Sequence, residues 1–339
     1  MFARLFRKTS LVAAAGLVAV VVGAGVAVAR GTATAAGVPA LGTGVVDVET
    51  NLGLEGGAAA GTGMVLTSSG IVLTNNHVIR GATTVRVLVP SSGRTYSASV
   101  LGYSVAADVA VLRLQGASSL QTVTTARFAR LRVGQAVTAV GNAGGARRLT
   151  LAPGRITGLA RTITASDGQN GAERLTGLIE TNTALQPGDS GGPLFDAAHR
   201  VVGMNTAASA GFVLTSSGDS YAIPINRALA IAKQVQAGKG SATVHVGGTP
   251  FIGVQLQSAD GGQSGLVVAG LVPGAPADRA GLAAGDVITA LDGTPVGSLS
   301  ALAGLLLRKA PGDTVQVTYV DGAGAEQTAT ITLASGPPQ

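Results

Sequence analysis

Ser190 lies in the strongest chemical motif of the sequence, the run GDSGGP at residues 188–193. A serine hydroxyl is a weak nucleophile and needs a neighbouring base to accept its proton. Glycines around such a serine let the backbone turn so that its N–H groups converge on one point, where an oxyanion can be stabilised. The motif therefore predicts acyl-transfer chemistry at Ser190, and the alternative is a glycine-rich turn without a catalytic role.

His77 and Asp108, which precede Ser190 in the sequence, have the side chains needed to activate the Ser190 hydroxyl. His77 follows an apolar run in LTNNHVI (residues 73–79), so its imidazole is expected at a strand end, where it can act as a base. Asp108 begins an apolar run in AADVAVL (residues 106–112), where a carboxylate needs a hydrogen-bonding partner, and orienting His77 is such a role. A structural histidine and a solvated turn aspartate are the alternatives. The chain order His77, Asp108, Ser190 is one of the known orders of a Ser-His-Asp triad.

Composition excludes several other kinds of site. The chain has no cysteine, which removes thiol nucleophiles, disulfides and cysteine metal sites. Its three histidines (His77, His199 and His245) are isolated, which argues against a histidine-rich metal site, and triad chemistry needs no cofactor. The net charge of +6 comes mostly from four basic residues in the first thirty, and no dense basic and aromatic stretch follows, so no nucleic-acid partner is expected.

The region around the three candidates predicts β-structure. Short runs of Val, Ile, Leu and Thr, broken by Gly, Ser, Asn and Pro, recur over residues 38–222 and are typical of an all-β barrel or sandwich. A helix is expected over residues 226–237, with Asn226 as N-cap and Gly238 closing it. Residues 238–249 then have the composition of a linker.

The last ninety residues predict a small α+β domain. Strands are expected at residues 251–256, 265–271, 287–291, 314–319 and 328–333. A helix is expected over residues 299–309, capped by Ser298 or Ser300 and presenting several leucines on one face.

The N-terminus has the pattern of an export segment. Residues 11–29 are uncharged and mostly apolar, follow a basic start and end in Ala-Val-Ala. This length lies between a signal peptide and a spanning helix, so either a cleaved signal or a retained membrane anchor is expected over residues 1–30, with a short linker at 31–37. In both cases the remaining chain is expected outside the cytoplasm.

The motifs TNNHVI, AADVAVLRL and QPGDSGGPL resemble those of trypsin-like serine proteases, and more closely those of the HtrA/Deg family, which carries a C-terminal PDZ domain. The run FIGV at residues 251–254 is similar to the carboxylate-binding loop of that PDZ domain. The resemblance implies a mainly β fold: a trypsin-like double β-barrel protease domain at residues 38–237, followed by a small α+β PDZ domain at 250–335 after the linker.

The family resemblance also implies residue roles. Ser190 is the expected nucleophile, His77 the general base and then acid, and Asp108 the residue that orients His77, while the N–H groups of Gly188 and Ser190 form the oxyanion hole. Substrate is expected beside Asn205, Thr206 and Ala207, with Ala184 and Ala222 at the primary specificity pocket. The expected peptide-binding residues of the PDZ domain are Phe251, Ile252, Gly253, Val254, Leu302 and Leu305.

The implied function is an extracytoplasmic serine endopeptidase that cleaves unfolded or exposed polypeptide segments, with a PDZ domain that binds C-terminal tails. The alternative is a catalytically weak chaperone or peptide-binding scaffold on the same fold. Two features depart from the family pattern. Asp189 stands where many relatives have Asn, and residues 31–94 lack the aromatic residues on which the family's homotrimer is partly built.

Overall fold

The computed structural model describes residues 41–54, 56–126, 130–166, 172–206, 213–214, 220–258 and 265–339. The predicted export segment, the linker at 31–37 and the substrate-binding candidate Ala207 lie outside these residues. No helix within the described part is both long enough and apolar enough to cross a membrane.

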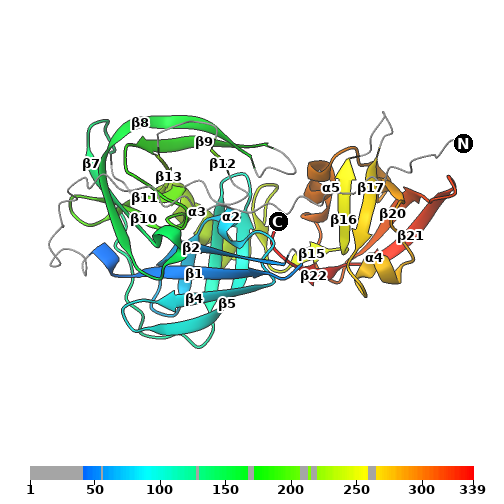
Figure 1. Ribbon diagram of the computed structural model, residues 1–339, viewed down its shortest axis with the longest axis horizontal. Coiled ribbons are helices and arrows are strands. Elements are labelled where there is room, and N and C mark those ends of the chain that lie inside the picture. Colours follow the sequence, from blue (N-terminus) through cyan, green and yellow to red (C-terminus); the bar gives the residue numbers. More distant parts are fainter. Residues whose placement is uncertain are drawn as a thin grey trace, which may run out of the picture. The chain divides into compact units, whose positions relative to one another are not determined.

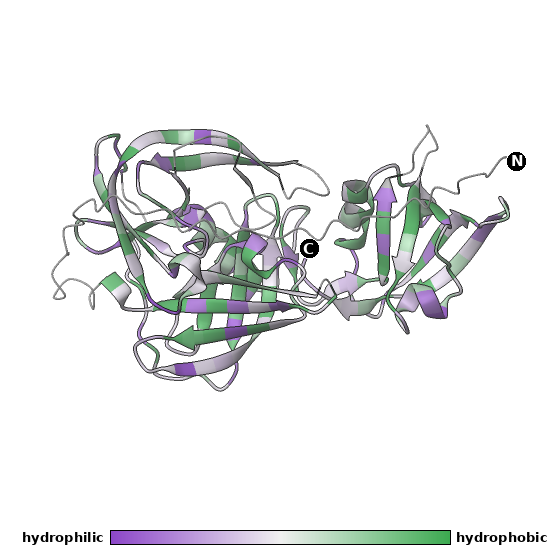
Figure 2. Cartoon of the chain, viewed as in Figure 1, coloured by the Kyte–Doolittle hydropathy of each residue, from purple (hydrophilic) through white to green (hydrophobic). Residues whose placement is uncertain are grey.

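Six antiparallel strands close the first β-barrel (Figure 1). They run in the order β5-β4-β1-β2-β3-β6, and an additional pairing of β5 with β6 closes the ring. Strand β1 alternates between hydrophobic and hydrophilic residues, as Figure 2 shows, because Val46 and Val48 belong to the barrel core while Asp47 and Glu49 face the other way. The strands are β1 (Val45–Leu52), β2 (Gly57–Val65), β3 (Ile71–Thr74), β4 (Thr84–Val89), β5 (Arg94–Ser104) and β6 (Val109–Leu114).

The second barrel is also formed by six antiparallel strands. Their order is β8-β7-β10-β11-β13-β9, and a pairing of β8 with β9 closes the ring. Strand β12 (Val213–Leu214) pairs with the end of β8 at Ala165 and Ser166. A large apolar core that includes Leu73 of the first barrel and Phe195 of the second joins the two. The strands are β7 (Ala136–Gly141), β8 (Thr150–Ser166), β9 (Ala172–Thr181), β10 (Pro193–Asp196), β11 (Val201–Thr206) and β13 (Ser220–Pro224).

Helix α3 (Ile225–Gln236) confirms the predicted helix, but its cap differs from the prediction. Pro224 occupies the N-cap position, and Asn226 lies inside the first turn, where its side-chain oxygen accepts the N–H of Arg227. The helix starts earlier than predicted because the buried Ile225 extends its apolar face into the core. Gly238 follows the C-cap with φ of +67°, as a closing glycine should.

The predicted linker contains a strand of the first barrel. Strand β14 (His245–Val246) pairs with Tyr103 and Gly102 of β5. Gly102 is required here, since a Cβ at this position would lie 2.4 Å from the main-chain oxygen of His245. The segment after α3 is therefore partly built into the barrel, which its polar and glycine-rich composition did not predict.

The last part of the chain forms the predicted α+β domain. Its core gathers Leu266, Ile288 and Val317 under helix α5 (Leu299–Leu306), and the Ser298 hydroxyl accepts the N–H of Ala301 as the predicted N-cap. Helix α5 ends three residues earlier than predicted. The other elements are β15 (Thr249–Phe251), β16 (Val254–Ser258), β17 (Leu266–Leu271), α4 (Pro276–Arg279), β18 (Val287–Leu291), β19 (Thr294–Pro295), β20 (Thr314–Val320), β21 (Glu326–Thr332) and β22 (Ala334–Gly336).

Candidate active site

His77 lies on a one-turn helix, α2 (Asn76–Ile79), that begins as soon as β3 ends. Its neighbours Val78 and Ile79 are buried in the core of the first barrel and fix the turn. The imidazole is thereby held at the end of a strand, as the sequence predicts, with only 3% of its side chain exposed.

Asp108 binds His77 through both carboxylate oxygens. Oδ2 lies 2.9 Å from His77 Nδ1, and Oδ1 accepts the main-chain N–H of His77 at 3.0 Å. The carboxylate is fully buried, and Asp108 has φ of 52°, a left-handed conformation that aspartate adopts more readily than most residues. Because a carboxylate only accepts hydrogen bonds, it selects the tautomer with a proton on Nδ1 and leaves the lone pair on Nε2, where a general base needs it.

Two residues that the sequence analysis did not assign to this role hold Asp108 in place. The Thr206 hydroxyl donates to Asp108 Oδ2 at 3.1 Å, and the Asn75 side chain donates to the main-chain oxygen of Asp108 at 2.9 Å. Both side chains are fully buried. Asn75 stands two residues before His77, which offered a weak signal in the sequence, whereas Thr206 comes from the second barrel and offered none.

Ser190 reaches this site on a loop of the second barrel that is fastened to the first. Its main-chain oxygen accepts the N–H of Thr62 on β2 at 2.8 Å. The next residue, Gly191, packs so closely that a Cβ would lie 2.4 Å from the hydroxyl oxygen of Thr74, the residue that ends β3. The structure thus brings Ser190 against the strand that leads into His77.

Gly188 has the geometry expected of an oxyanion loop. Its φ is +100°, and a Cβ would lie 2.3 Å from the main-chain oxygen of Asn142, so only glycine fits. The Thr62 hydroxyl donates to the Gly188 oxygen at 2.7 Å and accepts the N–H of Asn142 at 2.8 Å. Thr62 therefore fixes the orientation of the Gly188 peptide from the first barrel.

Asp189 is buried without a cationic partner among the described residues. Its Oδ2 accepts the N–H of Gln186 at 2.9 Å. Burial raises the pKa of the Asp189 carboxyl, against the opposing effect of the Gln186 N–H and the Thr150 hydroxyl. The Gln186 N–H thus binds Oδ2 within the same loop, whereas Oδ1 has no hydrogen-bond partner among the described residues.

The candidate substrate-binding residues differ in burial and in whether their main chain is already paired. The Asn205 main chain exchanges hydrogen bonds with Gly191 and Gly192 on one side and pairs with Ala222 on the other, so Asn205 does not offer an open strand edge. Ala222 is buried in the second barrel, whereas Ala184 is exposed on the loop before the nucleophile. Contact of Thr206 and Ala184 with substrate stays a prediction.

The PDZ-like domain has a groove at the predicted place. Phe251, Ile252, Gly253, Val254 and Leu302 line it, as expected. Leu305 does not line it and packs against the domain core instead, because the helical turn directs it away; Leu299, Ala303 and Leu306 complete the helix side of the groove.

A Gly253→Ala substitution should weaken peptide capture by this groove at least tenfold. Gly253 has φ of +84°, and a Cβ would lie 2.1 Å from that of Ala275, so the loop must shift its N–H groups. Fluorescence anisotropy with a labelled peptide that ends in apolar residues would measure the change. Gly322→Ala is the matched control, since a Cβ there meets nothing; equal binding by both variants would contradict the assignment of the loop.

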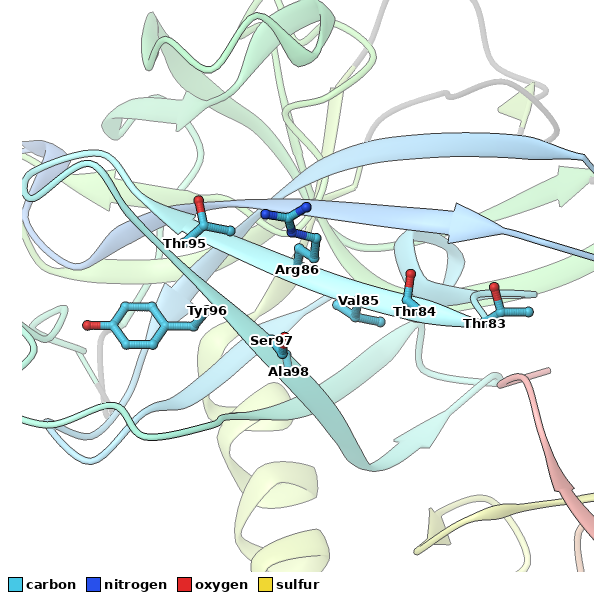
Figure 3. A pocket seen from close by; sticks show the side chains of 8 residues that line it. All are labelled: Thr83, Thr84, Val85, Arg86, Thr95, Tyr96, Ser97 and Ala98. Atoms are coloured by element: carbon cyan, nitrogen blue, oxygen red, sulfur yellow. The ribbon is translucent and has the colours of Figure 1, made fainter.

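A separate hollow of about 440 Å³ lies on strands β4 and β5 and contains no triad residue (Figure 3). Thr84, Arg86 and Thr95 extend from these strands in the close view. Across the described residues, no group of three or more His, Cys, Asp or Glu side chains could hold a metal ion.

Comparisons with known proteins identify both domains of the chain. Residues 61–204 match the trypsin-like peptidase domain, and residues 250–333 match the PDZ domain. The chain is 34% identical to serine protease PepD of Mycobacterium tuberculosis over 85% of its own length and 63% of the relative's. The chain carries a trypsin-like peptidase domain followed by a PDZ domain and is similar to the HtrA/Deg serine proteases.

Further HtrA/Deg relatives are similar to a comparable degree. The chain is 36% identical to the putative serine protease HhoA of Synechocystis, over 70% of this chain and 61% of the relative. It is 33% identical to periplasmic serine endoprotease DegP of Escherichia coli, over 72% of this chain and 50% of the relative. The chain therefore spans about half to two thirds of the length of these curated relatives. The solved HtrA-type protease AlgW with a tripeptide superposes with a TM-score of 0.51 and 27% identity, covering 89% of this chain and 97% of that one.

Proposed function

We propose that the protein is a serine endopeptidase that cleaves unfolded or exposed polypeptide segments through an acyl-enzyme. The observation that carries the proposal is the 2.9 Å contact between His77 Nδ1 and Asp108 Oδ2, within a site to which the Ser190 loop is fastened by hydrogen bonds. The paired His77 and Asp108, with a further hydrogen bond from the Thr206 hydroxyl to Asp108, favour catalysis over a scaffold role.

The residues act in a fixed order in this mechanism. His77 Nε2 takes the proton of Ser190 Oγ as the oxygen attacks the peptide carbonyl, and the N–H groups of Gly188 and Ser190 stabilise the oxyanion. His77 then gives the proton to the leaving amine, which breaks the peptide bond and leaves an acyl-Ser190. Water, deprotonated by His77, hydrolyses this ester and regenerates the enzyme.

The PDZ domain supplies a second polypeptide site in this proposal. A peptide that adds a strand beside β16 would place its carboxylate at the N–H groups of the 252–254 loop and an apolar side chain in the groove beside Leu302. The AlgW structures contain a bound tripeptide or decapeptide, which supports peptide recognition by this family.

We further propose that the enzyme works outside the cytoplasm. Several relatives are named periplasmic endoproteases, and residues 11–29 have the composition of an export or anchoring segment. Whether this segment is retained as an anchor, and whether the chain forms the homotrimer implied by its family, can be tested on the purified protein by N-terminal sequencing and light scattering.

A fluorophosphonate reagent tests the nucleophile directly. The reagent is expected to label one residue, Ser190, and to stop the release of peptides from casein in proportion to labelling, because only an activated serine reacts quickly. Mass spectrometry of the labelled peptide identifies the site. Casein binding without cleavage or labelling would instead support the scaffold alternative.

A further inference from the structure

Asp47 is a buried carboxyl group that the triad mechanism does not use. It lies on β1, is fully buried, and neither of its side-chain oxygens has a hydrogen-bond partner in the described structure. Leaving a buried polar group unpaired is costly, and more so when it is charged. Such a group calls for an explanation in function or in the packing around it.

The register of β1 places Asp47 next to the residue that fixes the oxyanion loop. Asp47 stands directly opposite Thr62 of β2, so the two side chains share one face of the sheet. Thr62 is the residue whose hydroxyl binds both the Gly188 oxygen and the Asn142 N–H. The face that carries Asp47 is therefore turned toward the catalytic loops of the second barrel.

A short segment of the second barrel, residues 142–147, connects this face to Gly188. Its end is tied to β1 by the ion pair of Arg147 with Glu49, and Gly145 packs against Ala60. On its other side the segment packs against Gly188. The Gly144 N–H binds the oxygen of Pro187 at 2.7 Å, and a Cβ on Gly188 would lie 2.3 Å from the Asn142 main-chain oxygen.

Asn142 provides a matching unpaired group. Its side chain is fully buried, and neither its oxygen nor its nitrogen has a partner among the described residues. Asn142 and Asp47 both adjoin Thr62, which makes the unpaired Asn142 amide nitrogen a candidate donor for the Asp47 carboxylate.

We propose that Asp47 is a positioning residue for the oxyanion hole: ionised Asp47 accepts a hydrogen bond from Asn142 and so holds segment 142–147, and through it Gly188, in the active arrangement. The inference rests on the proposed function, since it concerns a site that stabilises an acyl-transfer oxyanion. In this proposal, catalysis depends on the ionisation of Asp47 as well as on that of His77.

The charged groups around Asp47 are compatible with ionisation of its carboxyl group in the pH range in which such an enzyme works. Burial, with repulsion by Glu49, raises the pKa of Asp47 to about 6, against the attraction of Arg147. Strands β2 and β7 and the turn η1 (Ala143–Gly145) carry no titratable side chain. Strand β4 carries Arg86, which stands opposite Glu49.

Two further titratable groups, His77 and Asp189, lie near the elements that surround Asp47. His77 on α2 lies by the other face of β1, where Thr50 binds the main chain of the helix. Asp189 lies against Gly141, the residue before Asn142. Neither Asp47 oxygen is hydrogen-bonded to either group.

The test compares kcat and KM on fluorogenic casein from pH 5 to 9 for wild type, Asp47→Asn and Asp47→Leu. In wild type, Asp47 and His77 must both lose a proton, so log kcat should rise with a limiting slope near 2 on the acid side. Asp47→Asn retains an acceptor but does not titrate, so its slope should fall to about 1 while kcat at pH 8 stays within about threefold. Asp47→Leu should lower kcat at pH 8 by about 10- to 100-fold with KM unchanged, because the oxyanion donors shift.

Asp286→Asn is the control, since Asp286 is an equally buried carboxyl group outside the protease domain; its slope should remain that of wild type. Wild-type kcat and slope in both Asp47 variants would overturn the inference and leave the proposed function intact. Absence of turnover and of fluorophosphonate labelling in wild type would overturn both.

The pH dependence of the unfolding temperature is a second test of Asp47 ionisation. It compares wild type with Asp47→Asn and so does not need Asp47→Leu to fold. The folded pKa of Asp47 lies above its ordinary value of 3.8, so the folded protein binds more protons than the unfolded chain between about pH 4 and pH 6. Stability therefore falls as pH rises through this window. The Tm of Asp47→Asn should rise relative to wild type from pH 4.5 to pH 7.5, and a constant difference would contradict an ionising, buried Asp47.

Discussion

Replacing Ser190 by alanine should reduce kcat on casein by about 10⁶-fold, to the residual level left when a triad nucleophile is removed. The effect is expected to be this large because the attacking oxygen itself is lost. Folding should be preserved, since the loop is held by main-chain bonds, such as that from the Thr62 N–H to the Ser190 oxygen, which alanine retains. Peptide release measured beside wild type gives the ratio of rates.

Ser91→Ala is a matched control for this substitution, because Ser91 is exposed in the turn between β4 and β5. It should cleave casein at the wild-type rate. If the Ser190 variant retained even a hundredth of wild-type activity after repeated purification, the acyl-enzyme mechanism at Ser190 would be wrong.

Asp108→Asn should lower kcat by about 10⁴-fold with little change in KM, the magnitude known for this change in trypsin-like triads. The contacts explain why. The His77 main-chain N–H requires an acceptor at the Oδ1 position, so the amide nitrogen of asparagine must take the Oδ2 position, which faces His77 Nδ1. An N–H group there favours the tautomer protonated on Nε2, which cannot accept the serine proton.

Steady-state kinetics on casein and rates of fluorophosphonate labelling should fall together in this variant, since both depend on the same base. Asp278→Asn, at an exposed aspartate of helix α4, provides the control and should not alter either rate. A loss of less than tenfold for Asp108→Asn would mean that the tautomer of His77 is set by another group.

The three candidate residues could be selected from the sequence because each lies in a distinctive local run. The apolar strand before His77, the apolar strand after Asp108 and the glycines around Ser190 are all visible within a few residues of each side chain. The mainly β character and the closing α+β domain were predictable for the same reason, since strand and turn signals are local. The comparisons and the fold confirm both domains.

The features that escaped prediction depend on contacts between distant segments. Thr206 binds Asp108 from 98 residues further along the chain, and Thr62 fixes Gly188 across 126 residues. Asn226 has a residue type that is common at N-caps, but burial of Ile225 makes the helix start before it. In each case tertiary packing outweighs the local preference that the sequence displays.

Strand β14 has a practical consequence for anyone who wishes to study the protease domain alone. A protein truncated after α3 would lack His245 and Val246, and the edge of β5 at Gly102 and Tyr103 would be left bare. Bare strand edges recruit other chains, so such a truncation is prone to aggregate whether or not the PDZ domain regulates catalysis. A cut placed after Val246 keeps the edge covered, and only then does a change in activity report on the missing domain.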